Sequence, residues 1–218
     1  MIKFFNKRIF IIFISPLILG GLSTLSFQPY NYFFLNFFSL SSLFFLIVYV
    51  KKKSKSIYRK KPYLKNLFIL GTSYGYGFFL FGIYWIANSL TFDESYKFLI
   101  PLSLIFIPLF LSLFFSLPIL LIGNICDKNL SSIFLISIAF TFSDILRSQI
   151  LTGFPWNLWV YSFSWSLESL QILSVIGLFS LNLLVITILF LPSVIFFKSN
   201  FKFILLSFFI ILIFANYF

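Results

Sequence analysis

The sequence predicts an all-α protein, a polytopic transmembrane bundle of about seven helices. Of its 218 residues, 61% are hydrophobic and 23% are aromatic, and the mean hydropathy is +1.06, whereas an ordinary soluble domain is about half apolar. The few charges, 16 Lys and Arg against 5 Asp and Glu, lie mostly between long apolar runs. Because the bilayer core offers no water to backbone groups, such runs are expected to cross it as helices.

Seven apolar segments justify the helix count, and each is near the roughly 20 residues that a crossing needs. The first could be taken for a signal peptide, but no small-residue cleavage site follows it, so we interpret it as a retained helix. The longest polar stretch, residues 51–65, is short and basic, so we expect no soluble domain in residues 1–218. The predicted helices cover residues 9–25, 32–50, 66–90, 98–122, 130–150, 167–197 and 203–217.

The distribution of basic residues orients the predicted bundle. With a cytoplasmic amino terminus, every basic residue except Lys97 and Arg147 falls on the cytoplasmic side, as the positive-inside rule requires. The net charge of +11 therefore indicates membrane orientation, and we expect no nucleic-acid partner. We interpret residues 51–65 as an anchor that sets the orientation, and the alternative interpretation is a site for anionic lipid headgroups. The basic residues assigned to the cytoplasm are Lys3, Lys7, Arg8, Lys51, Lys52, Lys53, Lys55, Arg59, Lys60, Lys61, Lys65, Lys128, Lys198 and Lys202.

The histidine and cysteine content excludes several kinds of chemistry. The chain has no histidine, which excludes a Ser–His triad, an imidazole acid or base and a His-ligated metal. One cysteine, Cys126, excludes an intramolecular disulfide and a cysteine metal cage. Asp127 next to it opposes the thiolate that a reactive cysteine needs, so we interpret Cys126 as structural. We expect no metal site and no cofactor.

The predicted third and fifth helices carry polar or small residues that call for an explanation. In the third, glycines spaced by four and seven predict close helix packing, with an acyl-chain groove as the alternative, and Trp85 suits the lipid headgroup level. In the fifth, Asp144 and Arg147 lie one turn apart, and charges inside a membrane segment are functional candidates. They form either an interfacial ion pair that holds the next loop or, through Arg147, a bidentate lipid-phosphate site. The glycines are Gly71, Gly75 and Gly82.

The segment LTGFPWNLWVYSFSW, residues 151–165, contains three of the four tryptophans. Gly153 and Pro155 break helical continuation, so the segment is predicted to be an outer loop. Its Trp and Tyr side chains suit the boundary between water and lipid. One interpretation is an ordinary aromatic belt, and the other is a loop folded onto the membrane surface that lines a lipid entrance. The candidate residues, which either line this entrance or structure the loop, are Trp85, Arg147, Gly153, Phe154, Pro155 and Trp156.

Several motifs together resemble the bacterial apolipoprotein N-acyltransferases. LTGFPW at residues 151–156, preceded by Asp144 and Arg147, resembles the signature loop of that family. The resemblance extends over essentially the whole chain, because other motifs follow the family's order and spacing. These are GLSTLSFQPYNYF at 21–33 for the first loop, GTSYGYGFFLFGIYWI at 71–86 for the third helix, Tyr161 and Ser162 after the signature loop, and GLFSLNLLV at 177–185, with Asn182, for the sixth helix.

The resemblance implies the membrane portion of an enzyme in the bacterial inner membrane. Such an enzyme transfers an acyl chain from a phospholipid to the N-terminal cysteine of a lipoprotein, through a thioester on a cysteine of its own. That cysteine belongs to a Glu-Lys-Cys set in a periplasmic nitrilase-like domain after the seventh helix, whereas the sequence ends at Phe218. We therefore expect a chain truncated before that domain, with no catalytic residue and no activity alone. The implied partners are a phospholipid donor, a lipoprotein acceptor and membrane lipids.

Two alternatives of other classes remain open from the residues. A small polytopic transporter is one, although few ionisable groups lie where a transport path would need them. A noncatalytic membrane scaffold for a separate acyltransferase subunit is the other. A liposome flux assay would identify the transporter, and co-purification with a soluble nitrilase-like subunit would identify the scaffold.

Overall fold

The computed structural model describes residues 8–53, 62–150, 153, 155–166 and 171–197. Within these ranges the regular elements are all helical, which confirms the all-α prediction. Four described stretches are long and apolar enough to cross a membrane, and two shorter apolar helices accompany them. The four are Phe34–Lys53, Tyr63–Thr91, Glu94–Ile122 and Leu130–Gln149, and the shorter two are Phe10–Thr24 and Leu178–Val194. The predicted helix at 203–217 lies outside the described residues.

The first two predicted helices form close to their expected bounds. The first helical stretch of the described residues includes a π-helix, η1 (Phe10–Ile14), and continues as α2 (Ser15–Thr24), which has a proline in its first turn, where no N–H is needed. A turn with a cis peptide bond before Pro29 leads into α3 (Phe34–Lys53), which extends beyond the predicted 32–50. Its last turn consists of three lysines, and cations stabilise the carboxyl end of a helix.

The third and fourth predicted helices are less regular than expected. The third consists of α4 (Pro62–Ile83) followed by the 3₁₀ helix η2 (Tyr84–Thr91). After η3 (Glu94–Leu99), the fourth is divided into α5 (Ile100–Leu111) and α6 (Leu113–Ile122). Ser112 lies at the division, and its hydroxyl donates to the carbonyl oxygen of Leu109 at 2.6 Å. Such a bond to the preceding turn competes with the helical ladder and bends the helix.

The last described helices surround the long loop. The fifth predicted helix is α7 (Leu130–Gln149), capped by Asn129, which accepts from the backbone N–H of Ser132. After η5 (Trp159–Phe163), the predicted continuous helix 167–197 is wrong in its bounds. The structure divides its described part into α9 (Leu173–Ile176), α10 (Leu178–Phe190) and η6 (Leu191–Phe196). Gly177, with φ +79°, turns the chain between α9 and α10.

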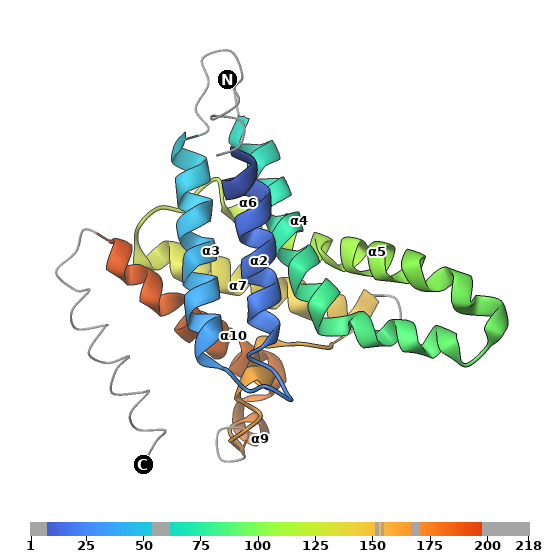
Figure 1. Ribbon diagram of the computed structural model, residues 1–218. Helices are drawn as coiled ribbons and strands as arrows, with labels where there is room; N and C mark the ends of the chain where they lie inside the picture. Colours follow the sequence, from blue (N-terminus) through green and yellow to red (C-terminus); the bar gives the residue numbers. More distant parts are fainter. Residues whose placement is uncertain (1–7, 54–61, 151–152, 154, 167–170, 198–218) are drawn as a thin grey trace.

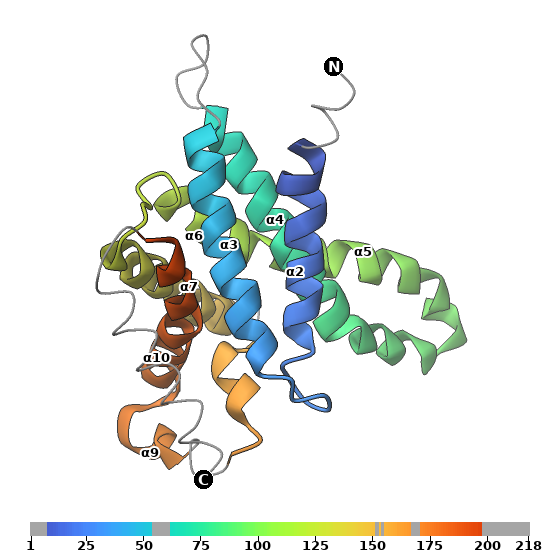
Figure 2. The same ribbon diagram turned by 60° about the vertical axis from the view of Figure 1, so that its left-hand side comes forward.

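The arrangement has a compact bundle and one projecting hairpin. In Figures 1 and 2, α2 and α3 run side by side, and α7 crosses their direction. The end of α4, η2, η3 and α5 form a hairpin that reaches away from the other helices in both views. Aromatic side chains cover this hairpin, and Phe92 near its tip is 92% exposed. Such a surface suits the aromatic belt of a membrane.

Glycines allow backbone-to-backbone contact at two helix interfaces. An ideal Cβ on Gly71 would lie 2.6 Å from the Cα of Ser116 in α6, and one on Gly75 would lie 2.9 Å from the Cα of Ser112 just before α6, so the packing interpretation of these two residues is confirmed. The sequence reasoning missed a second interface, between α2 and α4. There a Cβ on Gly20 would lie 2.0 Å from the Tyr74 carbonyl oxygen, and one on Gly77 would lie 2.1 Å from that of Leu17. Small residues permit this approach, which stabilises membrane helix pairs by dispersion contacts.

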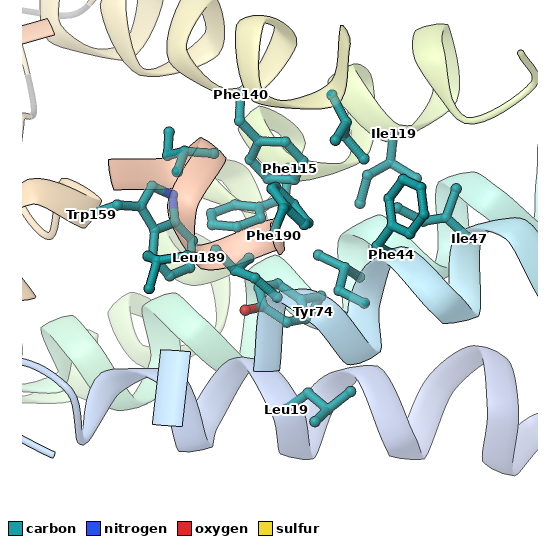
Figure 3. Close-up of a cluster of buried hydrophobic side chains, with 14 of the residues drawn as sticks. Leu19, Phe44, Ile47, Tyr74, Phe115, Ile119, Phe140, Trp159, Leu189 and Phe190 are labelled. Carbon is teal, nitrogen blue, oxygen red and sulfur yellow. The ribbon is translucent and has the colours of Figure 1, made fainter. Parts of the chain in front are cut away.

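A cluster of buried hydrophobic side chains, many of them aromatic, occupies the centre of the bundle (Figure 3). Phe115 is at its middle, 5.3 Å from Phe140 and 6.1 Å from Trp159 between ring centroids. Tyr74 lies at its margin, where its hydroxyl is 2.8 Å from that of Ser23 and 2.9 Å from that of Ser39. These three buried hydroxyls therefore satisfy one another within the bundle, as a dry interior requires.

The Gly20→Ala variant tests the α2–α4 contact. We expect its free energy of unfolding in detergent to fall by about 1–3 kcal/mol, because the added methyl group overpacks a backbone contact. Gly21→Ala is the matched control, since its methyl group would meet the Phe81 ring at 2.9 Å, and a side chain can shift. Thermal unfolding followed by circular dichroism measures both. Equal losses in the two variants would contradict the backbone contact.

Candidate functional site

The guanidinium of Arg147 lies at the centre of a buried polar network in the last turn of α7. Its side chain is only 2% exposed, and one terminal nitrogen donates to Asp144 Oδ1 at 2.8 Å. The other terminal nitrogen donates to the carbonyl oxygen of Trp156 at 2.7 Å. Arg147 therefore ties α7 to the loop that follows it, the arrangement anticipated as an ion pair that holds the loop.

Asn182 extends this network to α10. Its side-chain nitrogen donates to Asp144 Oδ2 at 2.9 Å, and its side-chain oxygen accepts from the backbone N–H of Val160 at 3.1 Å. Asn182 is fully buried. The Asp144 carboxylate thus joins α7 to α10, and the Asn182 amide joins α10 to η5, so the positions of three elements depend on the same few atoms.

Burial strengthens each interaction in this network, but it also makes the loss of any one partner costly. Removing two charges from water is costly, and the cost is offset only when geometry and further hydrogen bonds satisfy the pair. Here Asp144 accepts from two partners, and the Phe79 ring lies 5.2 Å from the guanidinium carbon of Arg147, within cation–π range. The Nε–H of Arg147 has no acceptor in the described part of the chain.

The loop held by this network does not place all of its tryptophans at the surface, as the sequence predicted. The sequence placed them together at the water–lipid boundary, but Trp159 is 1% exposed and lies 5.1 Å from Phe78 between ring centroids. Burial removes a large aromatic surface from water or headgroups, so Trp159 belongs to the core. Trp156 is 52% exposed, so it remains available at the surface.

Two predicted entrance residues from different segments meet at this surface. Trp85 in η2 and Trp156 in the loop pack edge to face, with ring centroids 5.6 Å apart. Gly82 allows this approach, because a Cβ there would lie 2.3 Å from the Asn157 side-chain nitrogen. The tryptophan pair of Trp85 and Trp156 is therefore attached to Arg147 through the Trp156 carbonyl oxygen.

The other predicted entrance residues lie around the turn of the loop. Gly153 adopts φ +83°, and a Cβ there would lie 2.5 Å from the Ser148 carbonyl oxygen, so both conformation and space favour glycine. Pro155 is exposed. Phe154 lies outside the described residues. The network thus brings Arg147, Trp156 and Trp85 together, with Gly153 shaping the turn between them.

Cys126 lies at the other end of α7, in the loop before it. Its thiol is buried, and burial raises its pKa to about 12, with Lys51 opposing the rise and Asp127 adding to it. Lys51 donates to the Cys126 carbonyl oxygen and to Asp127, at 3.0 Å and 3.3 Å. A neutral thiol with these neighbours is not an activated nucleophile. No group of metal-ligating side chains occurs among the described residues.

Sequence reasoning missed the contact between Asn182 and Asp144. Asn182 was noticed for its place in a motif, without a partner. Its signal was an amide in the otherwise apolar run LFSLNLLVITILF, because a polar group in a membrane helix is expected to meet another one. The sequence could not show that this partner was Asp144 on α7.

The Asn182→Ala variant tests the network. It leaves Asp144 Oδ2 and the Val160 N–H without their partner, so we expect stability to fall by about 1–3 kcal/mol and the loop at residues 155–166 to be cleaved faster by added protease. Thr187→Ala is the matched control on α10, because the Thr187 hydroxyl bonds only within its own helix, to Leu183. A loop equally resistant in Asn182→Ala and Thr187→Ala would show that Asn182 does not hold it.

Comparison with known proteins places this architecture in one family. Residues 19–191 match the model of the apolipoprotein N-acyltransferase N-terminal domain. A protein of Rhodopseudomonas palustris named apolipoprotein N-acyltransferase is 30% identical over 182 residues, 83% of this chain and 33% of the relative. Proteins of the same name from Allorhizobium ampelinum and Brucella suis are each 28% identical over 80% of this chain, and over 33% and 32% of their own lengths.

The matched stretch contains the whole buried network and the tryptophan pair. The chain spans about a third of the length of these curated relatives. The family match covers more than half of the chain and agrees with the all-α architecture. The chain therefore belongs to the apolipoprotein N-acyltransferase family, through its N-terminal domain.

Proposed function

We propose that this chain is the membrane-embedded part of an apolipoprotein N-acyltransferase in the bacterial inner membrane, with a cytoplasmic amino terminus. In this role it presents the acyl chains of a phospholipid donor and a lipoprotein acceptor to the acyl-transfer centre. The observation that carries the proposal is the family match over residues 19–191, a stretch that includes Asp144, Arg147, Asn182 and the tryptophan pair.

We infer a specific part in this function for the loop residues 153 and 155–166. Its exposed tryptophan pair suits the headgroup level of a membrane, while the buried network fixes the backbone behind it. Arg147 acts as a positioning residue for Trp156, and Gly153 and Pro155 shape the turn. We also assign Trp85 to the proposed lipid entrance and, from its place in the sequence alone, Phe154. Holding reactants in one orientation can remove several kcal/mol from a reaction barrier, which is the benefit of a rigid entrance.

A chimera tests the proposed function. The matched N-terminal region of the Rhodopseudomonas palustris relative is replaced by residues 1–191 of this chain and produced in cells depleted of their own N-acyltransferase. We expect the chimera to restore N-acylation of a lipoprotein, measured by mass spectrometry of its N-terminal peptide, because both segments share one family architecture. A chimera carrying Thr187→Ala serves as a control that should remain active.

The Asn182→Ala chimera addresses the role of the network. It should lose activity at low phospholipid content more than at high content, because a loosened entrance weakens substrate positioning. If the chimera without further substitutions is stably inserted but inactive at every phospholipid content, the proposed function is contradicted.

The proposed orientation is tested by cysteine labelling in cells. Phe92→Cys and Lys53→Cys are made in a Cys126→Ser background, because both positions are exposed and lie at opposite ends of the membrane segments. A membrane-impermeant maleimide should label Phe92→Cys in intact spheroplasts and Lys53→Cys only after permeabilisation, as the basic residues require. The reverse labelling pattern would place the tryptophan pair on the cytoplasmic side and overturn the orientation.

A further inference from the structure

Basic residues from four segments gather at one end of the bundle, the end opposite the loop that contains η5 (Figures 1 and 2). Arg8 joins the start of α4 there, because its guanidinium donates to Asn66 Oδ1 at 2.7 Å. Lys51 joins the loop before α7 to the end of α3 by donating to the Cys126 carbonyl oxygen and to Asp127. We call this surface the basic end, and its described basic residues are Arg8, Lys51, Lys52, Lys53, Lys65 and Lys128.

The basic end carries a net positive charge that the chain itself does not neutralise. The other two described basic residues, Lys97 and Arg147, each form an ion pair with an acidic residue one turn away. In the segments that form the basic end, the sequence has one acidic residue, Asp127, which contacts Lys51 at 3.3 Å. One carboxylate among these cations leaves a surplus that attracts anions at a membrane surface.

An exposed face of α3 leads to these cations. Residues three or four apart lie on one face of a helix, and the face that carries Phe34 and Phe38 continues through Phe45 and Tyr49 to Lys52. Phe34 and Phe38 are 56% and 61% exposed, so this face is directed away from the core. The half-buried rings of Phe45 and Tyr49 lie 6.1 Å apart between centroids. The face is therefore an apolar stripe that ends in lysine.

Lys128 reaches the same stripe from the loop before α7. Its ammonium nitrogen lies 5.7 Å from the centroid of the Phe45 ring, within cation–π range. Lys52 follows Phe45 by seven residues, about 10 Å along the helix axis, and Tyr49 lies between them. The positive-inside rule accounts for the number of lysines at this end, but not for a lysine from a second segment over a ring of the exposed face. Two segments thus place lysines on either side of one tyrosine.

The chemistry of this arrangement selects its occupant. Ammonium groups and a phenolic hydroxyl can all donate hydrogen bonds, so they require an anionic oxygen acceptor, and the apolar stripe requires a hydrocarbon chain next to it. The amine of a zwitterionic headgroup would be repelled by the same lysines. We propose that Lys52, Tyr49 and Lys128 bind the phosphate of a phospholipid with a net negative headgroup, with an acyl chain along Phe45.

This site is separate from the proposed lipid entrance. The tryptophan pair includes Trp85 of η2, which follows α4, whereas the basic end lies at the start of α4. The inference rests on the proposed function only in requiring that the helices lie in a bilayer. A headgroup bound here contacts both α3 and the loop before α7, beside the ion pair of Lys51 and Asp127. The bound lipid therefore stabilises the basic end and takes no part in acyl transfer.

Native mass spectrometry of the intact chain in detergent tests the inference. Phosphatidylglycerol and phosphatidylethanolamine with the same acyl chains are titrated separately, and the lipid-bound fractions give the dissociation constants. We expect phosphatidylglycerol to bind more tightly, and Lys128→Gln to weaken its binding by about fivefold, the contribution of one lysine near an anionic lipid. Equal affinities for the two lipids would overturn the proposal.

Matched variants separate the site from overall charge. Lys97→Gln removes the same charge from η3, where the lysine side chain is 45% exposed, and should leave the affinity for phosphatidylglycerol unchanged. Lys52→Gln should weaken binding as Lys128→Gln does, and it replaces Lys128→Gln if circular dichroism shows that this variant does not fold. Equal losses in Lys97→Gln and the folded site variant would show that only overall charge matters and would overturn the site.

Two further arms identify the ligand and its position. Glycerol phosphate should not displace the lipid, because it lacks the acyl chain, and displacement by it would overturn the lipid assignment. A phosphatidylglycerol with a diazirine in its headgroup should label the peptide that contains Tyr49 in nanodiscs, and labelling confined to the peptide that contains Trp85 would overturn the position.

These measurements need no acyl transfer, so they can fail independently of the proposed function. Equal binding of the two lipids together with an active chimera would refute only this site. Selective binding of phosphatidylglycerol together with an inactive chimera would refute only the proposed function.

Discussion

The buried contact between Asp144 and Arg147 is the constraint on which the arrangement of α7, α10 and the loop between them depends. A single ion pair in an apolar interior is stabilised only when further hydrogen bonds meet most of its remaining capacity. That requirement brings Asn182 of α10 to the carboxylate and the backbone of Trp156 to the guanidinium. The described residues of the loop that follow Pro155, up to η5, are therefore held by electrostatics.

The rest of the bundle is held by close packing. The contacts of α2 with α4 and of α4 with α6 have glycine on at least one side, because membrane helices cannot rely on exclusion from water to associate. Aromatic side chains such as Phe115 fill the space that these close contacts enclose. The loop after α7 is thus specified by hydrogen bonds, and the helix interfaces are specified by shape. Helix α4 takes part in both, because its glycines pack against α2 and α6 while its Gly82 lies against Asn157 and its Phe79 against Arg147.

The sequence was informative wherever a property belonged to one segment. Apolar length predicted α3 and α7 within a few residues, and the spacing of Asp144 and Arg147 predicted their ion pair. Properties that depend on two distant segments were missed, such as the Asn182 contact and the α2–α4 interface. The break at Ser112 and the burial of Trp159 were also missed. A serine is as compatible with the middle of a helix as with a break, and a tryptophan is as compatible with the membrane interface as with the core, so residue type alone could not decide either case.

The location of both ionised partners on one helix has a consequence for biogenesis. Asp144 and Arg147 neutralise each other within α7, so the segment can leave the translocon as a dipole instead of as two separate ions, and a dipole costs less to transfer into hydrocarbon. Asn182 is synthesised later and can donate the second hydrogen bond to the Asp144 carboxylate once α10 packs against α7. The order of synthesis thus matches the order in which the polar groups need their partners.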